Sequence, residues 1–122
     1  MKQLRVYIDT SVFGGYFDDE FEAPTRRFFD LATNRQCTVL VSDLLMEEME
    51  NAPPRVRELV ARSIVEGAEH ITTTEYALLL QEAYLAARVV SRRYADDALH
   101  VALATIVRAD AIASWNWSIR CA

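Results

Sequence analysis

Short apolar runs alternate with longer amphipathic segments along the chain. The apolar runs cover residues 4–8, 38–41, 70–72 and 111–115, and most are rich in β-branched or other apolar side chains. Runs of this length and composition are typical of buried strands. Because helical segments separate them, we expect a parallel sheet that helices cover on both faces. No linker or internal repeat interrupts the alternation, so we expect a single domain over residues 1–122.

Local signals predict where the helices begin and end. Pro24 suits the first turn of a helix, and the Pro-containing segment 51–54 ends one helix and begins another. The expected helices start near Pro24, follow residues 42–43, run from 53–54 to Gly67, cover 76 to about 90, and cover about 95 to 108. Ser42 or Asp43 can cap the second of these helices. Thr72 and Glu75 have the spacing of a capping box before the helix that begins at 76.

The net charge of the chain says more about its possible binding partners than its apolar and charged fractions do. The chain is 52% apolar and 25% charged, which is ordinary for a globular domain, and the slight apolar excess would suit an oligomer or an obligate partner. With 18 acidic and 13 basic residues the net charge is −5. Such a surface does not attract nucleic acid by its overall field. Nucleic-acid chemistry would therefore require a local basic patch or a bound metal ion.

The cysteines and the N-terminus indicate a compartment. Cys37 and Cys121 do not have the spacing of metal ligands, so a reduced intracellular protein is the simplest interpretation. The N-terminus leads directly into a predicted strand, without the pattern of a signal peptide. The apolar runs are also much shorter than a membrane span. We expect a cytoplasmic protein without a membrane segment.

Acidic and amide side chains follow the predicted strands. Asp9 follows the first strand, Glu48 lies in the helix after the second, Asn116 follows the last, and Asp96 and Asp97 open the helix before it. Because ligands bind at the carboxyl ends of parallel strands, these residues can meet at one edge of the sheet. Without basic partners they would repel each other unless a divalent cation lay between them. A set of oxygen ligands without His or Cys clusters favours Mg²⁺ or Mn²⁺ over zinc.

The first two acids also have structural explanations. Asp9 is a suitable helix N-cap, a role that does not exclude binding a metal. Glu48 lies on the apolar stripe of its helix, between Leu44 and Ala52. A carboxylate on that side is costly unless it is paired or bound to metal. The alternatives for Glu48 are a pair with a buried arginine or a slight rotation of the helix.

The last predicted helix is apolar nearly all round, which indicates a buried helix. Asp97 shares a face with Val101 and Ala104, although the helix dipole alone would favour acids in the first turn. A lone histidine on such a helix is more often a hydrogen-bonded core residue than a metal ligand, and we expect this of His100. Asn116 is either a turn residue or an amide that carries a metal-bound water.

Four segments resemble, in order, the motifs of PIN domains. They are Ile8-Asp9-Thr10-Ser11-Val12-Phe13, the stretch from Val41 to Glu48, residues 97–104 (DALHVALA) and residues 109–116 (ADAIASWN). The last has the form found in a bacterial and archaeal branch related to the VapC toxins. The resemblance implies a three-layer α/β/α sandwich around a central parallel sheet of about four strands. It also implies a Mg²⁺- or Mn²⁺-dependent ribonuclease that is the toxin of a toxin–antitoxin pair, a homodimer, and a VapB-like antitoxin partner.

The resemblance also assigns site residues. Asp9 matches the family's first acid, Glu48 the second and Asp97 the third, whereas Asn116 stands where the wider family usually has aspartate. Asp96 could compensate for that difference. A PIN-like binding module with weakened catalysis is therefore the alternative to an active nuclease. Relatives usually continue into another strand beyond the position of Ala122, so either this protein is naturally short or a C-terminal strand is missing.

Taken together, these residues predict metal-assisted hydrolysis of an RNA phosphodiester bond. Asp9, Glu48 and Asp97 would hold one or two ions, and the metal would activate a water and neutralise developing charge. Arg92 and Arg93 either contact substrate phosphates or form a solvated helix end. A dehalogenase-type phosphatase would need a second aspartate two residues after Asp9, and a receiver domain would need an acidic pair after its first strand. Neither pattern is present.

Overall fold

The computed structural model describes residues 3–64 and 67–115 of the chain. Its sheet has four strands, all parallel, in the order β3-β2-β1-β4. The strands are β1 (Leu4–Ile8), β2 (Cys37–Ser42), β3 (Glu69–Ile71) and β4 (Ala111–Ala113). The register aligns Val6 of β1 with Val39 on one side and Ala111 on the other. All four predicted strands are present, and the last ends two residues earlier than expected.

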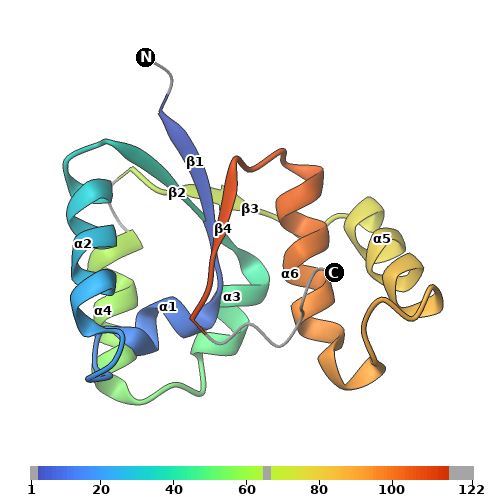
Figure 1. Cartoon of the computed structure of the whole chain (residues 1–122), viewed down its shortest axis with the longest axis horizontal. Coiled ribbons are helices and arrows are strands. Elements are labelled where there is room, and N and C mark those ends of the chain that lie inside the picture. Colours follow the sequence, from blue (N-terminus) through green and yellow to red (C-terminus); the bar gives the residue numbers. More distant parts are fainter. Residues whose placement is uncertain (1–2, 65–66, 116–122) are drawn as a thin grey trace.

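Helices cover both faces of this sheet (Figure 1). On one face lie α1 (Thr10–Gly15), α2 (Glu22–Thr33) and α4 (Pro54–Ile64), and on the other lie α5 (Glu75–Ala86) and α6 (Ala95–Ile106). The short helix α3 (Asp43–Met49) follows β2 at the carboxyl edge, and the 3₁₀ helix η1 (Arg92–Tyr94) precedes α6. The arrangement confirms the predicted three-layer α/β/α sandwich.

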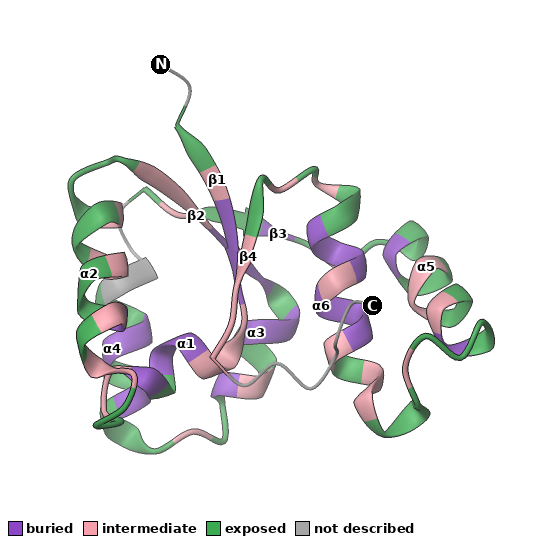
Figure 2. Cartoon of the chain, in the orientation of Figure 1, coloured by how far each residue is buried: buried purple, intermediate pink, exposed green. Residues whose placement is uncertain are grey.

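The alternation of side chains along the strands divides the core in two. Val6 and Ile8 of β1 pack with Val12 and Phe13 of α1 and with residues of α4. The intervening Tyr7 packs on the opposite face with residues of α5 and α6. Because successive strand residues point to opposite faces, one strand supplies both layers of the core. Buried residues accordingly concentrate in the strands and in the helix faces turned toward them (Figure 2).

Several helix boundaries differ from the expected ones. The helix predicted to extend to about residue 90 ends at Ala86, because Arg88 adopts a left-handed backbone with φ 58°. The Val89 amide then donates to the carbonyl of Tyr84, which closes a Schellman-type end without glycine. At the start of the same helix the cap is Thr74, whose hydroxyl accepts from the amide of Ala77. The expected capping box beginning at Thr72 was therefore wrong by two residues.

Candidate functional site

The candidate acids lie at one edge of the sheet. Asp9 directly follows β1 and caps α1, Glu48 lies in α3 directly after β2, and Asp97 lies in the first turn of α6. In Figure 1 the starts of α1, α3 and α6 are all at the end of the sheet where β1 and β4 finish. The structure thus places Asp9, Glu48 and Asp97 at the carboxyl edge, because all the strands point the same way.

The carboxylate of Asp9 is held on both oxygens. Its Oδ1 accepts from the Ser11 amide at 3.0 Å and from the Ser11 hydroxyl at 2.6 Å, and its Oδ2 accepts from the Ser114 hydroxyl. The Asp9 amide also donates to the carbonyl of Ala113 at 3.3 Å. The capping role proposed for Asp9 is thus present, and the end of β4 is fixed against the same carboxylate.

Glu48 is half-buried, and its partner is a histidine. Its Oε1 accepts from the Thr10 hydroxyl at 2.9 Å and lies 2.6 Å from Nε2 of His100. Burial alone would raise the pKa of Glu48, but the hydrogen bond and charge of His100 and the hydrogen bond from Thr10 together lower it. The expected alternative of a buried arginine partner is therefore wrong, because His100 occupies that place.

His100 is a hydrogen-bonded core residue, as the sequence indicated. It is 5% exposed, and its Nδ1 lies 2.6 Å from the hydroxyl of Tyr7, which in turn donates to the Ser42 hydroxyl at 3.0 Å. Burial raises the pKa of Tyr7 well above its usual range. The sequence pattern indicates Ser42 only as a helix cap, which the structure confirms, and it gives no role to Tyr7. The available signal was a tyrosine between the apolar residues Val6 and Ile8 of a predicted buried strand, since a buried hydroxyl requires a partner.

Asp97 lies within the electrostatic field of the other acids. Burial raises its pKa first, and the charges of Asp9, Glu48 and Asp96 raise it further, although His100 acts in the opposite direction. Asp96 itself is exposed. A carboxyl group whose neighbours disfavour its ionised form is one that a cation would stabilise. The charges of Asp9 and Glu48 therefore act on Asp97, although the three acids come from separate parts of the chain.

The donor chemistry suits a hard divalent cation, because the acids supply carboxylate oxygens. Within residues 3–64 and 67–115, however, no group of three or more His, Cys, Asp or Glu side chains is arranged so that it could hold a metal ion. The assignment of Asp9, Glu48, Asp97 and Asp96 as metal ligands therefore stays a prediction. Asn116, the expected fourth position, lies outside the described residues.

Trp115 is the last described residue, and it contacts the serine that holds Asp9. Its ring stacks on Phe21, with centroids 5.5 Å apart and planes 9° from parallel. Its amide donates to the Ser11 hydroxyl at 2.8 Å, and Ser11 in turn donates to Asp9. Packing of the indole is therefore connected to the position of the first acid through one hydroxyl group.

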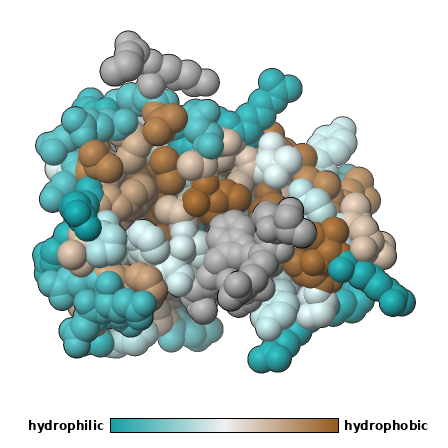
Figure 3. Space-filling view, in the orientation of Figure 1, coloured by the Kyte–Doolittle hydropathy of each residue, from teal (hydrophilic) through white to brown (hydrophobic). Residues whose placement is uncertain are grey.

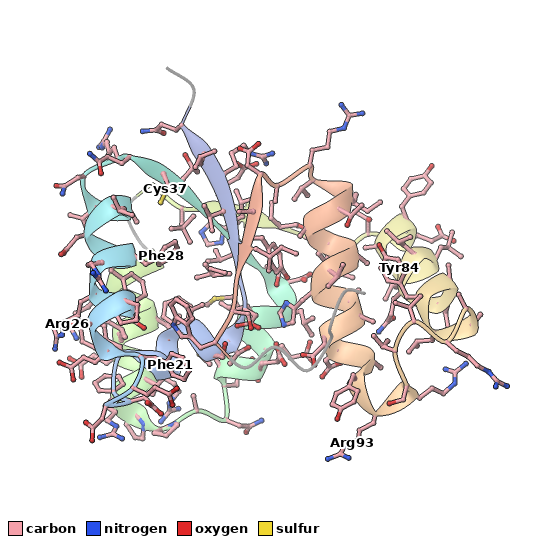
Figure 4. All side chains as sticks on the ribbon, viewed as in Figure 1. Phe21, Arg26, Phe28, Cys37, Tyr84 and Arg93 are labelled. Atoms are coloured by element: carbon pink, nitrogen blue, oxygen red, sulfur yellow. The ribbon has the colours of Figure 1, made fainter. Side chains whose placement is uncertain are left out.

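The two arginines before α6 are exposed. Arg92 forms an ion pair with Glu82 at 3.7 Å, and the Arg93 guanidinium lies 5.5 Å from the ring centre of Tyr94. Figure 4 shows Arg93 pointing away from the sheet at the lower end of the molecule. Their expected contact with substrate phosphates stays a prediction.

Comparison with known proteins identifies the class. A family model described as PIN domain matches residues 5–118, so the chain belongs to the PIN domain family. A search of curated proteins finds no match. Among solved structures, VapC20 of Mycobacterium tuberculosis, described as a toxin that cleaves the sarcin–ricin loop, superimposes with a TM-score of 0.71. The likeness covers 93% of this chain and 92% of VapC20 at 12% sequence identity, and it supports the same fold.

Across the described parts of the chain, no helix is both long enough and apolar enough to cross a membrane.

Proposed function

We propose that this PIN domain is a metal-dependent endoribonuclease that hydrolyses RNA phosphodiester bonds with Mg²⁺ or Mn²⁺. The observation that carries the proposal is the placement of Asp9, Glu48 and Asp97 at the carboxyl edge of the sheet, where burial and the charges of the other two acids raise the pKa of Asp97. Burial and the charges of these acids disfavour the ionised form of Asp97, and a divalent cation bound beside it would favour that form. The proposal agrees with the family of the chain.

In this proposal Asp9, Glu48 and Asp97 hold the cation, and Asp96 or Asn116 completes the ligand set. When bound, the cation would lower the pKa of a water molecule and neutralise the charge that develops on the phosphate. Ser11 and Ser114 keep the Asp9 carboxylate in place. Thr10 and His100 do the same for Glu48. No side-chain nucleophile is needed.

We also propose that the protein is the toxin of a type II toxin–antitoxin pair, a homodimer, and a cytoplasmic protein. The similarity to VapC20 supports the toxin role and a VapB-like antitoxin partner. Apolar side chains on and beside α5 and α6 are exposed, and they supply surface that a second copy or an antitoxin could cover: Tyr76, Leu78, Leu79, Val89 and Ile106. Brown surface is visible over this part of the molecule in Figure 3. A free Cys37 thiol agrees with a reducing compartment.

A second candidate is a PIN-like binding module with little nuclease activity. The observation in its favour is the asparagine at position 116, where the wider family usually has an acid. A module of this kind would still present Asp9, Glu48 and Asp97 to a cation. It would therefore bind Mn²⁺ and fail to cleave RNA.

The decisive experiment compares wild type with Asp9→Asn, Asp97→Asn and Asn116→Asp, using Mn²⁺ titration calorimetry and cleavage of single-stranded RNA. The matched control is Glu47→Gln, because Glu47 is an exposed neighbour of Glu48 in the same helix. We expect Asp9→Asn and Asp97→Asn to weaken Mn²⁺ binding and lower cleavage by orders of magnitude, with the control unchanged. Cleavage by Asp9→Asn at the wild-type rate would disprove the site. Activity confined to Asn116→Asp would favour the binding module.

A further inference from the structure

A continuous row of polar side chains crosses the core behind Glu48. It runs from the Ser42 hydroxyl to Tyr7 at 3.0 Å, from Tyr7 to Nδ1 of His100 at 2.6 Å, and from Nε2 of His100 to Glu48 at 2.6 Å. Tyr7 is 0% exposed and His100 is 5% exposed. The row therefore begins inside the protein and ends at the candidate site.

These polar groups stand among apolar neighbours. Tyr7 belongs to the core cluster that includes Leu40, Leu44 and Leu99. A buried hydroxyl or imidazole left without a partner destabilises the fold, whereas apolar side chains of similar shape would fill the same space without needing a partner. Apolar packing alone would not require these hydrogen-bonded side chains at these positions. The group at the exposed end of the row is the carboxylate of Glu48.

The chemistry of the groups fixes the direction of the last bond. Nε2 of His100 lies 2.6 Å from Oε1 of Glu48, and an ionised carboxylate can only accept hydrogen bonds. Nε2 of His100 must therefore be protonated and donate. The Tyr7 hydroxyl engages the other ring nitrogen and so fixes the orientation of the imidazole. Ser42, behind Tyr7, also accepts from the Leu45 amide and caps α3, the helix that carries Glu48.

Both hydrogen bonds that Glu48 accepts from the described residues end on the same oxygen. Thr10 and His100 each contact Oε1. Oε2 is therefore the oxygen left for a cation. Outer partners that orient a ligating carboxylate in this way typically account for 10–100-fold in metal affinity or activity.

We propose that His100 is a positioning residue, which Tyr7 and Ser42 hold in place and which fixes the orientation of the Glu48 carboxylate. The proposal rests on the proposed function, because it assumes that Glu48 is a metal ligand. His100 does not touch substrate or metal in this account. It acts only through Glu48. Its effect on Mn²⁺ affinity can therefore be distinguished from a general effect on folding.

The test measures Mn²⁺ affinity by calorimetry, together with kcat and KM for RNA, in His100→Leu, His100→Gln and Tyr7→Phe. We expect His100→Leu to weaken Mn²⁺ binding by about 10–100-fold and to lower kcat in parallel, with KM for RNA little changed. His100→Gln, whose amide can still donate to Glu48, should recover part of the affinity. Tyr7→Phe keeps the imidazole but loses its support, so its loss should be smaller than that of His100→Leu.

Leu99→Ala is the matched control, because Leu99 is buried in the same helix but lies outside the polar row. It should lower stability and leave Mn²⁺ affinity unchanged. In a Glu48→Gln background, His100→Leu should cause no further loss of Mn²⁺ affinity, since the two residues act as one unit. A loss of affinity in Leu99→Ala equal to that in His100→Leu would show a merely structural role and overturn the proposal.

The failures of the two proposals can be told apart. If wild type neither binds Mn²⁺ nor cleaves RNA, the proposed function fails and the role of His100 fails with it. If wild type binds Mn²⁺ and His100→Leu binds it equally well, the role of His100 alone is refuted. If His100→Leu does not fold, Tyr7→Phe and His100→Gln decide, and wild-type Mn²⁺ affinity in both would refute the inference.

Discussion

Gly15, the last residue of α1, is packed directly under the indole of Trp115. A Cβ atom added at Gly15 would lie 2.5 Å from Cδ1 and 2.8 Å from Nε1 of Trp115, and 2.8 Å from the Thr25 hydroxyl oxygen. Carbon atoms pack best at roughly 3.5–4.0 Å, so Gly15→Ala requires a displacement of about 1 Å. The neighbouring Gly14 has no atom within 4 Å of the same added group. The two glycines therefore form a matched pair.

Gly14→Ala and Gly15→Ala are expected to change the free energy of unfolding in opposite directions. Replacing glycine by alanine in a helix gains roughly 0.5–1 kcal/mol, which is the whole effect expected for Gly14→Ala. At Gly15 the same gain is opposed by overpacking, which costs typically about 1–3 kcal/mol. The net effect of Gly15→Ala is a loss of about 1–2 kcal/mol. For a domain of this size that corresponds to a decrease in Tm of about 4–8 °C.

Thermal unfolding and tryptophan fluorescence in a Trp117→Phe background provide the assay. We expect Gly15→Ala to shift the emission of Trp115 to the red, because the displaced indole leaves its stack on Phe21. Since the Trp115 amide donates to Ser11, which holds Asp9, Mn²⁺ affinity should also fall. Equal stability of Gly14→Ala and Gly15→Ala, with an unchanged emission spectrum, would refute this account of the packing.

Four further predictions concern two charged groups, a helix end and the fourth position of the site. In EDTA, Asp97→Asn should raise Tm at pH 7. The folded-state pKa of Asp97 is raised, so ionisation of Asp97 lowers the stability of the wild type as the pH rises through the ordinary aspartate range. The gain in Tm should vanish well below about pH 4, where Asp97 is protonated in both the folded and the unfolded state. Glu48→Gln should lower Tm at pH 7, because the lowered pKa of Glu48 stabilises the fold above the ordinary glutamate range. The difference in Tm from wild type should disappear as the pH falls through the folded-state pKa. For either variant, a Tm difference from wild type that does not change with pH would contradict the prediction. Arg88→Gly should stabilise the fold by about 0.5–1 kcal/mol in urea unfolding, because it removes a side chain from the left-handed region, and a loss of stability would count against it. Asn116→Asp should raise Mn²⁺-dependent RNA cleavage or leave it unharmed, and a drop in cleavage would show that the asparagine is itself required.

The order of the elements could be predicted from the sequence because short segments that contain β-branched residues alternate with longer helical segments. β1 agrees with its predicted bounds, and the acids at the strand ends follow from the parallel topology. The end of α5 could not be predicted, because arginine rarely adopts the left-handed backbone that Arg88 has. The choice of Thr74 over Thr72 as the cap was also open, since three consecutive threonines precede the helix.

The partner of Glu48 had no local signal. The amphipathic pattern showed that this carboxylate faces inward, which correctly indicated a paired or metal-bound group. His100 is 52 residues away along the chain, and Tyr7 is 93 residues from His100. Only the packing of α6 against β1 and α3 brings these side chains together. Pairing of this kind depends on tertiary structure and cannot be predicted from the periodicity of apolar residues.

The most direct test of the proposed metal site is anomalous diffraction from crystals of wild type soaked in Mn²⁺. The account predicts a manganese peak within coordination distance of carboxylate oxygens from Asp9, Glu48 and Asp97, with ligand distances typical of a hard cation. It further predicts that Glu48 contributes Oε2 while Oε1 stays bonded to Thr10 and His100. A saturated crystal without manganese between these three residues, or with manganese bound only elsewhere, would contradict it.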